Sequence, residues 1–424
     1  MSRLQTFYFL VATQTLSVIG SRMTSIAVAI LIFNDTGSAT PLLLTTFFNE
    51  LPAMLGNSFA GVLVDRWDRR RVLMLADIGQ ALGSLLLMAS FMSGGFQLWH
   101  LYTVALVQGI FGMFHEPAKD ATTALLVPKG RRDRANAIQQ MAFPLAGVVA
   151  PALAGLFYLL VGIVGILVID LVTFVVAVVA VFVVRIPNPA ASAEGRAAHG
   201  GLLREWRGGL RFLRARPALL GVVVYYMLIA FLVNGPLELA IPYLMTITGS
   251  TTLSGLILAV TSLGAFAGAA LLAVRNVARG RVPIMLWSLL VTGVMFLIYG
   301  TTRSPLVLAL SVFTLMIPLP VAWTLLTSLL ISKTPPDMQG RVLAIALQLA
   351  YVGSTLSFLL TGPLADRVLE PLAAVPGEGM GWLLVGAGAL ILLLTLAAYA
   401  LPGIRRVEQA VPDDDALPVG AAGD

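Results

Sequence analysis

The chain has 424 residues, of which 58% are hydrophobic and only 11% charged, and its mean hydropathy is +0.91. Soluble domains carry about 25% charged residues, so this composition excludes a soluble fold, because there is too little polar material to cover one. The chain has no cysteine, which excludes a disulfide framework, a thiolate metal site and a thiol nucleophile, and its formal net charge is +6.

The apolar residues fall into about a dozen runs of roughly 20 residues, the length that spans a bilayer as an α-helix. Apolar length and turn signals predict six spans in the first half of the chain: 6–33, 41–64, 72–93, 98–127, 135–162 and 164–185. Six more are predicted in the second half: 218–246, 253–275, 282–301, 305–332, 340–368 and 379–402. Polar and proline residues interrupt some runs, so eleven or thirteen spans stay open as alternatives. The sequence predicts an all-α polytopic membrane protein with twelve transmembrane helices.

The basic residues lie mostly on one side of these predicted spans. If the first loop is outside and the loops alternate, nearly all of the 27 Lys and Arg residues face inward, and only Arg303 and Arg367 face outward. This positive-inside asymmetry places both termini in the cytoplasm. It also explains the basic charge by contact with anionic membrane lipids rather than with nucleic acid. The first apolar run is too long for a cleaved signal peptide, so none is expected.

A polar stretch over residues 186–217 divides the chain into two halves, residues 1–185 and 218–402, and a tail follows over 403–424. The second part of this stretch places Leu and Trp residues at helical spacing beside arginines, which predicts an amphipathic helix at the inner membrane face. A short pattern of Pro, Arg, Ala and Ile precedes the fifth predicted span of each half. Such a weak internal repeat is typical of secondary transporters, which are built from two related halves around a central site.

The sharpest motif lies at the inner end of the second predicted span. It consists of a glycine, two acidic residues and four arginines: Gly61, Asp65, Arg66, Asp68, Arg69, Arg70 and Arg71. Gly61 would let a neighbouring backbone approach closely, and Asp65 could accept hydrogen bonds from a helix N-terminus. The arginines could pair across the loop. Anchoring at the inner membrane surface is the plainer interpretation, but the Gly-x-Leu-x-Asp-Arg frame argues against anchoring as its only role.

This motif resembles the signature loop of the major facilitator superfamily, G-x-L-x-D-R-x-G-R-R, which joins the second and third helices. The chain departs from that signature at Asp68. Its D-R-x-D-R-R form is similar to the drug–proton antiporter branch that holds macrolide efflux proteins and the enterobactin exporter. Five further segments match that branch: 49–52, 169–174, 207–213, 340–342 and 362–367.

The resemblance covers roughly residues 1–405 and implies a fold of two pseudo-symmetric six-helix bundles. It also implies alternating access, in which one small solute moves per cycle. The loop over 61–71 is then expected to latch the cytoplasmic side by closing against the inner end of helix 11.

A pattern in the fifth predicted span indicates the direction of transport. Gly147, Pro151 and Gly155 resemble the antiporter signature G-x-x-x-G-P-x-x-G-G, with two alanines in place of glycines. Small residues around a proline produce a bend and a tight helix interface. Ordinary packing stays open as the alternative, because any membrane helix can carry Gly and Pro. The arginine of another exporter signature is replaced by Ala105, which puts in doubt any coupling scheme that requires that arginine.

Ionisable residues inside membrane spans are costly and mark functional sites by default. At 1.5 Å per residue, Arg22, Glu50 and Glu238 lie about 12 to 16 Å from the outer ends of the first, second and seventh spans. The three are expected to share one substrate and proton site. Glu50 is the first choice for the coupling carboxyl and Glu238 the second. A static Arg22–Glu50 ion pair that only orients two helices is the alternative.

A second group of charged residues lies near the inner end of the fourth predicted span. Glu116, Lys119 and Asp120 are spaced i, i+3 and i+4 on one helix face, next to His115. Glu116 and Asp120 are further candidates for coupling, and a neutralised structural cluster is the plainer interpretation. Asp170, only about 9 Å into the sixth span, is expected to be a structural hydrogen-bond partner.

Enzyme signatures are missing from the sequence. His115 and Glu116 lack the second histidine of H-E-x-x-H, and no G-x-x-x-x-G-K-[ST] loop is present, so neither a metal nor another cofactor is expected. We interpret the chain as a monomeric exporter of amphiphilic small molecules, macrolide-like drugs above all, in exchange for protons across a bacterial inner membrane. A lipid flippase or a solute importer on the same fold, and a channel, stay open as alternatives.

Overall fold

The structure is a computed structural model, and it describes residues 2–128, 131, 134–135, 138–139, 141–184, 202–274, 280–335, 338–401 and 408. Every regular element in these residues is helical, which confirms the predicted all-α class. Nine of the described helical stretches are long and apolar enough to cross a membrane. The protein is therefore a multi-pass membrane protein.

Helices coincide with every predicted span of the first half. They are α1 (Arg3–Thr36), α2 (Thr40–Arg66), α3 (Arg69–Met92), α4 (Leu98–Leu126) and α6 (Ala142–Val183). The 42 residues of α6 measure about 63 Å, twice the thickness of a bilayer core, so this helix covers the fifth and sixth predicted spans. The two parts meet at a kink at Gly162, where φ is 65°. Only glycine adopts this conformation at little cost.

Helices also coincide with the predicted spans of the second half. They are α9 (Pro217–Glu238), α10 (Ala240–Thr248), α11 (Thr251–Val274), α12 (Arg281–Thr301), α13 (Pro305–Met316), α14 (Pro318–Ser332), α15 (Gln339–Leu364) and α16 (Glu378–Ala400), and α8 (Leu202–Arg214) precedes them in the linker. A π-helical turn (Ala365–Leu369) and a 3₁₀ turn (Glu370–Leu372) follow α15. The seventh predicted span is divided into α9 and α10, and the tenth into α13 and α14. The count of twelve spans stays a prediction.

Pro236, the third residue of the Asn234-Gly235-Pro236 sequence, does not interrupt the helix in the seventh predicted span. Helix α9 continues through Pro236 to Glu238. The hydroxyl of Ser357 on α15 accepts a hydrogen bond from the Gly235 N–H at 3.0 Å and donates one to the Phe231 carbonyl. Because these bonds satisfy backbone groups around the proline, the helix survives it.

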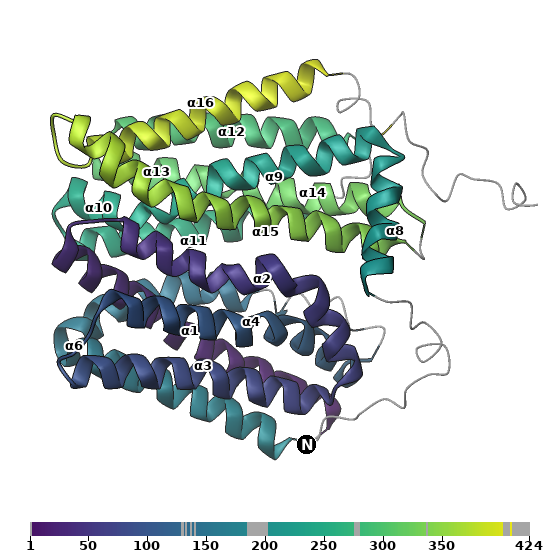
Figure 1. The fold of residues 1–424 in the computed structure, drawn as a ribbon, viewed down its shortest axis with the longest axis horizontal. Coiled ribbons are helices and arrows are strands. Elements are labelled where there is room, and N and C mark those ends of the chain that lie inside the picture. Colours follow the sequence, from purple (N-terminus) through teal and green to yellow (C-terminus); the bar gives the residue numbers. More distant parts are fainter. Residues whose placement is uncertain are drawn as a thin grey trace, which may run out of the picture. The chain divides into compact units, whose positions relative to one another are not determined.

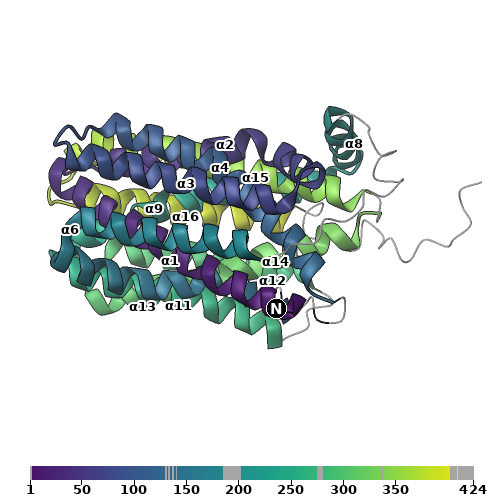
Figure 2. The same ribbon diagram turned by 90° about the horizontal axis from the view of Figure 1, so that it is seen from below.

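The chain divides into two compact units. The first consists of residues 1–197, 237–263 and 358–380, and the second of residues 198–236, 264–357 and 381–424. In the first unit α1 packs along α6, α2 along α4, and α3 against both α4 and α6 (Figures 1 and 2). In the second unit α12 packs against α13 and α14. The predicted division into two six-helix bundles stays a prediction.

The predicted amphipathic helix of the linker forms as α8 in the second unit. Figure 1 shows α8 crossing the end of α15, and a Cβ at Gly209 would lie 3.1 Å from the Arg341 carbonyl oxygen. This close approach needs a glycine on α8. Leu213 is fully buried, so the apolar side of α8 packs onto its own unit.

Candidate functional site

The three ionisable side chains that were predicted to share one depth come together in the first unit. Glu238 is the last residue of α9, and its Oε1 accepts a hydrogen bond from Thr46 Oγ1 at 3.0 Å. Thr46 lies one helical turn before Glu50 on α2, so both face the same way. Glu238 interacts electrostatically with Arg22 on α1 and with Glu50. Helices α1, α2 and α9 thus contribute one charged group each.

These three groups do not form a closed ion pair. Within the described part of the chain, no carboxylate oxygen lies within 4.0 Å of Arg22, whose guanidinium instead lies over the Phe143 ring at 4.0 Å from the centroid. Arg22 and Glu50 are half-buried and Glu238 is exposed. The static Arg22–Glu50 ion pair is therefore absent from this conformation.

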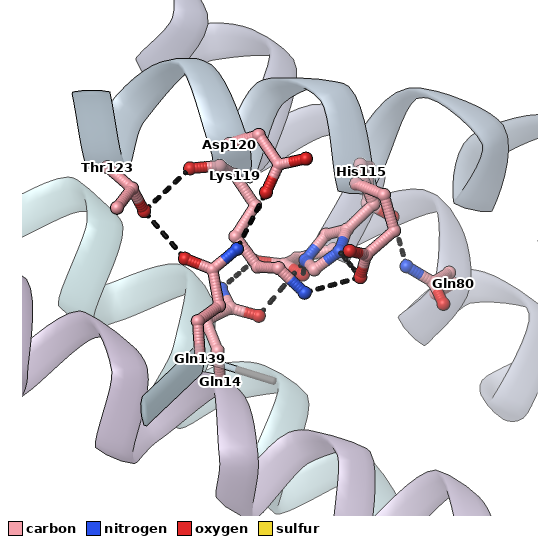
Figure 3. A network of polar contacts seen from close by, with 10 residues as sticks. Gln14, Gln80, His115, Lys119, Asp120, Thr123 and Gln139 are labelled. Atoms are coloured by element: carbon pink, nitrogen blue, oxygen red, sulfur yellow. Dashed lines mark hydrogen bonds and ion pairs between the residues drawn. The ribbon is translucent and has the colours of Figure 1, made fainter. Parts of the chain in front are cut away.

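The charged residues of α4 belong to a larger polar network than the sequence suggested (Figure 3). Lys119 donates to Glu116, as the helical spacing predicts. Asp120 instead accepts a hydrogen bond from Gln139 Nε2 at 2.8 Å, and Gln139 Oε1 accepts one from Thr123. The trio is therefore divided between two sets of partners, because Gln139 is nearer to Asp120 than Lys119 is.

The centre of this network is His115, which the sequence placed only beside the charged trio. Its Nε2 lies 3.0 Å from Gln14 Oε1 on α1 and 3.2 Å from Asp77 Oδ1 on α3. Gln14 Nε2 donates to Asp77 Oδ2 at 2.9 Å. Sequence reasoning missed Asp77 and Gln14. The signal was a lone aspartate between Ala76 and Ile78 inside a predicted span, which depth arithmetic could have included.

Two side chains of the loop over 61–71 make hydrogen bonds that stabilise helix ends. Asp68 caps the N-terminus of α3, where its Oδ1 accepts a hydrogen bond from the Arg71 N–H at 3.1 Å. Arg70 donates to the carbonyl oxygens of Val181, at 3.0 Å, and Phe182, which belong to the last turn of α6. Arg70 thereby satisfies carbonyl groups that a helix end leaves without partners.

For the remaining residues of this loop the structure describes fewer contacts. Arg69 begins α3, and the Arg71 side chain is exposed. The backbones of Asp65 and Arg66 end α2, but their side chains lie outside the described residues, as does the predicted contact of Asp65 with a helix N-terminus. Among the described residues no atom lies within 4 Å of a Cβ built at Gly61, so the close approach expected there is not found in this conformation.

The glycines of the fifth predicted span differ from each other. A Cβ at Gly147 would overlap the side chain of Ser262 on α11, so α6 and α11 touch at this point. Pro151 is buried inside α6. A Cβ at Gly155 would meet no neighbouring atom of the described residues within 4 Å. The tight interface predicted from the motif is therefore found at Gly147 and not at Gly155.

A carboxylate of the 362–367 segment caps a helix of the first half. Asp366 accepts hydrogen bonds from the backbone N–H of Ala39 at 3.1 Å and of Thr40 at 2.6 Å, and from the hydroxyls of Ser38 and Thr40. A Cβ at Gly362 would lie 2.8 Å from the Thr40 Cα. These contacts lie within the first unit and at the outer side by the predicted topology.

Asp170 has the structural setting that the sequence predicted. Its two oxygens accept hydrogen bonds from Ser21 on α1 at 3.0 Å and from Ser84 on α3 at 2.9 Å. The side chain is 1% exposed, and it joins α1, α3 and α6.

Comparison with known proteins places this geometry in a family. The family model described as Major Facilitator Superfamily matches residues 10–358. Macrolide efflux protein A of Streptococcus pyogenes is 26% identical over 417 residues, which cover 95% of this chain and 97% of that protein. The multidrug efflux pump Tap of Mycolicibacterium fortuitum is 26% identical over 92% of this chain and 94% of its own length. The enterobactin exporter EntS of Salmonella typhimurium is 25% identical over 95% of this chain and 93% of its own length.

A solved structure supports the fold. The bacterial homolog of the human lysosomal transporter Spinster, in an inward-facing and unoccupied conformation, superimposes with a TM-score of 0.73. The match covers 96% of this chain and 98% of that structure at 16% sequence identity, which shows a shared fold.

Proposed function

The chain belongs to the major facilitator superfamily, and on that premise we propose that it exports amphiphilic small molecules, macrolide-like drugs above all, in exchange for protons. A member of this family is a transporter and not an enzyme. The relatives named for macrolide and multidrug efflux support export, because the similarity to them extends over more than nine tenths of the chain. Gly147, in the antiporter-like motif of α6, adds support for that direction.

The observation that supports proton exchange most strongly is the meeting of Arg22, Glu50 and Glu238. Ionisable groups inside a membrane span are energetically costly, and those that are present usually serve a substrate or ion pathway. Here two carboxyls and one guanidinium interact electrostatically, and no short ion pair fixes the guanidinium to either carboxyl in this conformation. A carboxyl in this setting can be neutral in one conformation and ionised in another, since burial and a nearby cation act in opposite directions. That change is what proton exchange requires.

The proposed cycle is alternating access with a gate on each side. We assign the cytoplasmic gate to the loop over 61–71, with Asp65 as the residue that caps the inner end of the eleventh predicted span, α15, when the inner side closes. The protein would lie as a monomer in a bacterial inner membrane, with both termini cytoplasmic and the basic loops against anionic lipid. The substrate binds in a conformation that is open to one side of the membrane and leaves from a conformation that is open to the other side.

Transport into everted membrane vesicles tests this function. Vesicles that contain the chain are supplied with macrolides, tetracyclines and siderophores, each with and without a proton gradient, and vesicles without the chain are the control. We expect accumulation of at least one macrolide that stops when the gradient is dissipated. Accumulation that is indifferent to the gradient would contradict proton exchange, and no accumulation of any of these compounds would contradict drug export.

Two further measurements separate the alternatives. Movement of a fluorescent lysophospholipid between leaflets, without drug accumulation, would indicate a lipid flippase. Uptake into right-side-out vesicles at the expense of the gradient would indicate an importer. Single-channel currents in planar bilayers would indicate a channel.

A further inference from the structure

His115 lies between two carboxyl groups that differ greatly in exposure. The Glu116 side chain is 67% exposed, the His115 side chain 12%, and the Asp77 side chain 1%. The ring faces Asp77 Oδ1 with Nε2 at 3.2 Å and Glu116 Oε1 with Nδ1 at 3.9 Å. One imidazole therefore connects a carboxylate at the surface of the unit with a carboxylate in its interior.

The hydrogen bonds around Nε2 fix where the ring carries its hydrogen. Gln14 Nε2 donates to Asp77 Oδ2, so the amide oxygen of Gln14 must face His115. Both neighbours of His115 Nε2, the Gln14 and Asp77 oxygens, are then acceptors. Nε2 consequently holds a hydrogen, and the lone pair of the neutral ring lies on Nδ1, on the side of Glu116.

The charges that face the ring allow it to take a second proton. They are Asp77 from α3 and Glu116 and Lys119 from α4, whereas α1 contributes only the uncharged amide of Gln14. No described side chain of α2 interacts with the ring. Two carboxylates and one ammonium carry a net negative charge, so a protonated ring makes the group neutral. A neutral group is favoured where charges are removed from water.

A small cavity beside the network can hold water. It measures about 40 Å³, and its polar lining includes Gln14, His115, Lys119 and Gln139. A water molecule needs roughly 10 to 15 Å³ measured in this way and two to four polar partners, so the cavity has room for a few. A small shift of the Glu116 side chain closes the 3.9 Å between Glu116 Oε1 and Nδ1 of the ring.

We propose that His115 relays a proton between Glu116 and Asp77, and that Asp77 is a buried proton-binding group of this protein. In the relay, a proton leaves the Glu116 carboxyl and forms an N–H bond at Nδ1. The Nε2–H bond then breaks, and its proton forms an O–H bond at Asp77 Oδ1. One proton has moved and no electron has been transferred. The reverse steps restore the starting tautomer. The relay rests on the proposed exchange of protons for substrate and adds a proton site to it.

The ring itself can be observed without any change at the site. The chain has three histidines, so the double variant His100→Gln/His199→Gln leaves His115 alone. Glutamine suits position 100, which fills the third position of a helix capping box. Nitrogen-15 NMR of this protein in lipid reports the hydrogen on each ring nitrogen. We expect a hydrogen on Nε2 at high pH and on both nitrogens at low pH, with the change between about pH 5 and about pH 8. We also expect erythromycin to change the proportion of the two forms.

Transport separates a relay from a structural network. We expect His115→Gln and Asp77→Asn to lower gradient-driven accumulation of macrolide by about tenfold or more, while exchange of substrate without a gradient continues. His100→Gln is the matched control, since it changes a histidine at the other end of the same helix. Equal expression and detergent extraction of all variants show that they fold.

The outcomes distinguish the relay from the exporter proposal. If the unchanged protein accumulates no compound, the exporter proposal fails, whatever the NMR spectrum shows. If it accumulates macrolide with a gradient and both variants match it, the relay is wrong. A ring that keeps one protonation state over the whole pH range, with and without erythromycin, overturns the relay as well. Loss of gradient-free exchange together with driven transport assigns the network to structure alone and equally overturns it.

Discussion

Asp366, in the π-helical turn after α15, accepts hydrogen bonds from the backbone N–H and the hydroxyl of Thr40, the first residue of α2. The sequence led us to expect this arrangement, a carboxylate at a helix N-terminus, for Asp65 on the inner side. In the structure Asp366 provides it on the predicted outer side. A negative charge is stabilised there because the first backbone N–H groups of a helix lack partners within the helix.

Replacing Asp366 by Asn should loosen this end of α2. The substitution removes the charge and weakens the cap by about 1 kcal/mol, a change of about fivefold in a two-state equilibrium. Because the chain has no native cysteine, Leu43→Cys gives a single thiol, in a buried position beside Gly362. A membrane-impermeant maleimide should label it about fivefold faster in the Asp366→Asn background.

Arg367→Gln is the matched control for this labelling, because Arg367 is the exposed neighbour of Asp366. It should leave the labelling rate unchanged. A rate in the Asp366→Asn background equal to that in the Arg367→Gln background would show that the cap does not hold this end closed.

On the inner side we expect Asp65→Asn to abolish transport without impairing membrane insertion. If Asp65 caps the inner end of α15 when the inner side closes, a loss of about 1 kcal/mol or more shifts the protein towards inward-open forms. Spin-label distances between the two inner ends, in the cysteine-free background, measure this shift. Full transport at equal expression would remove the gate role from Asp65.

Two glycines of one motif should respond differently to the same substitution. Gly147→Ala places a methyl group on the Ser262 side chain, so the α6–α11 contact must open and transport should fall. Gly155→Ala meets open space and should be tolerated. Ser262→Gly, added to Gly147→Ala, should restore vesicle transport. Equal losses at both glycines would mean that the motif acts through backbone flexibility rather than through this contact.

Arg70 should matter more for stability than its neighbour Arg71. Arg70→Gln removes charged hydrogen bonds to two carbonyl groups at the end of α6 and should cost about 1.5 to 3 kcal/mol. Arg71→Gln changes an exposed side chain and should cost little. The midpoints of thermal unfolding in detergent compare the two, and equal midpoints would show that anchoring to lipid is the role of both arginines.

The helices and the common depth of Arg22, Glu50 and Glu238, called here the outer charged group, could be predicted because their signals are local. Apolar run length gave the helices, and a rise of 1.5 Å per residue put Arg22, Glu50 and Glu238 at one depth. Depth does not determine how a side chain is paired. Arg22 lies on Phe143 and Glu238 binds Thr46, and these contacts depend on helix rotation and on residues distant in the sequence.

The polar network around His115 could not be predicted from the sequence for a related reason. Asp77, Gln14 and His115 lie on three helices, and each residue alone is typical of a helix end or of a satisfied polar group in a core. Only packing of α1, α3 and α4 brings them together. The sequence around Pro236 does not show that α9 continues past this proline, since the serine that satisfies the backbone there lies on α15.

The central claim, exchange of drug for protons through the outer charged group, is tested most directly by proton flux in proteoliposomes. Purified protein is reconstituted with a pH-sensitive dye inside, and a macrolide gradient is applied without a proton gradient. We expect substrate entry to drive proton exit in the unchanged protein. We expect Glu50→Gln to abolish that flux while substrate binding and gradient-free exchange continue. Normal proton flux in Glu50→Gln, and again in Glu238→Gln, would contradict the account, because no carboxyl of this group would then carry the proton.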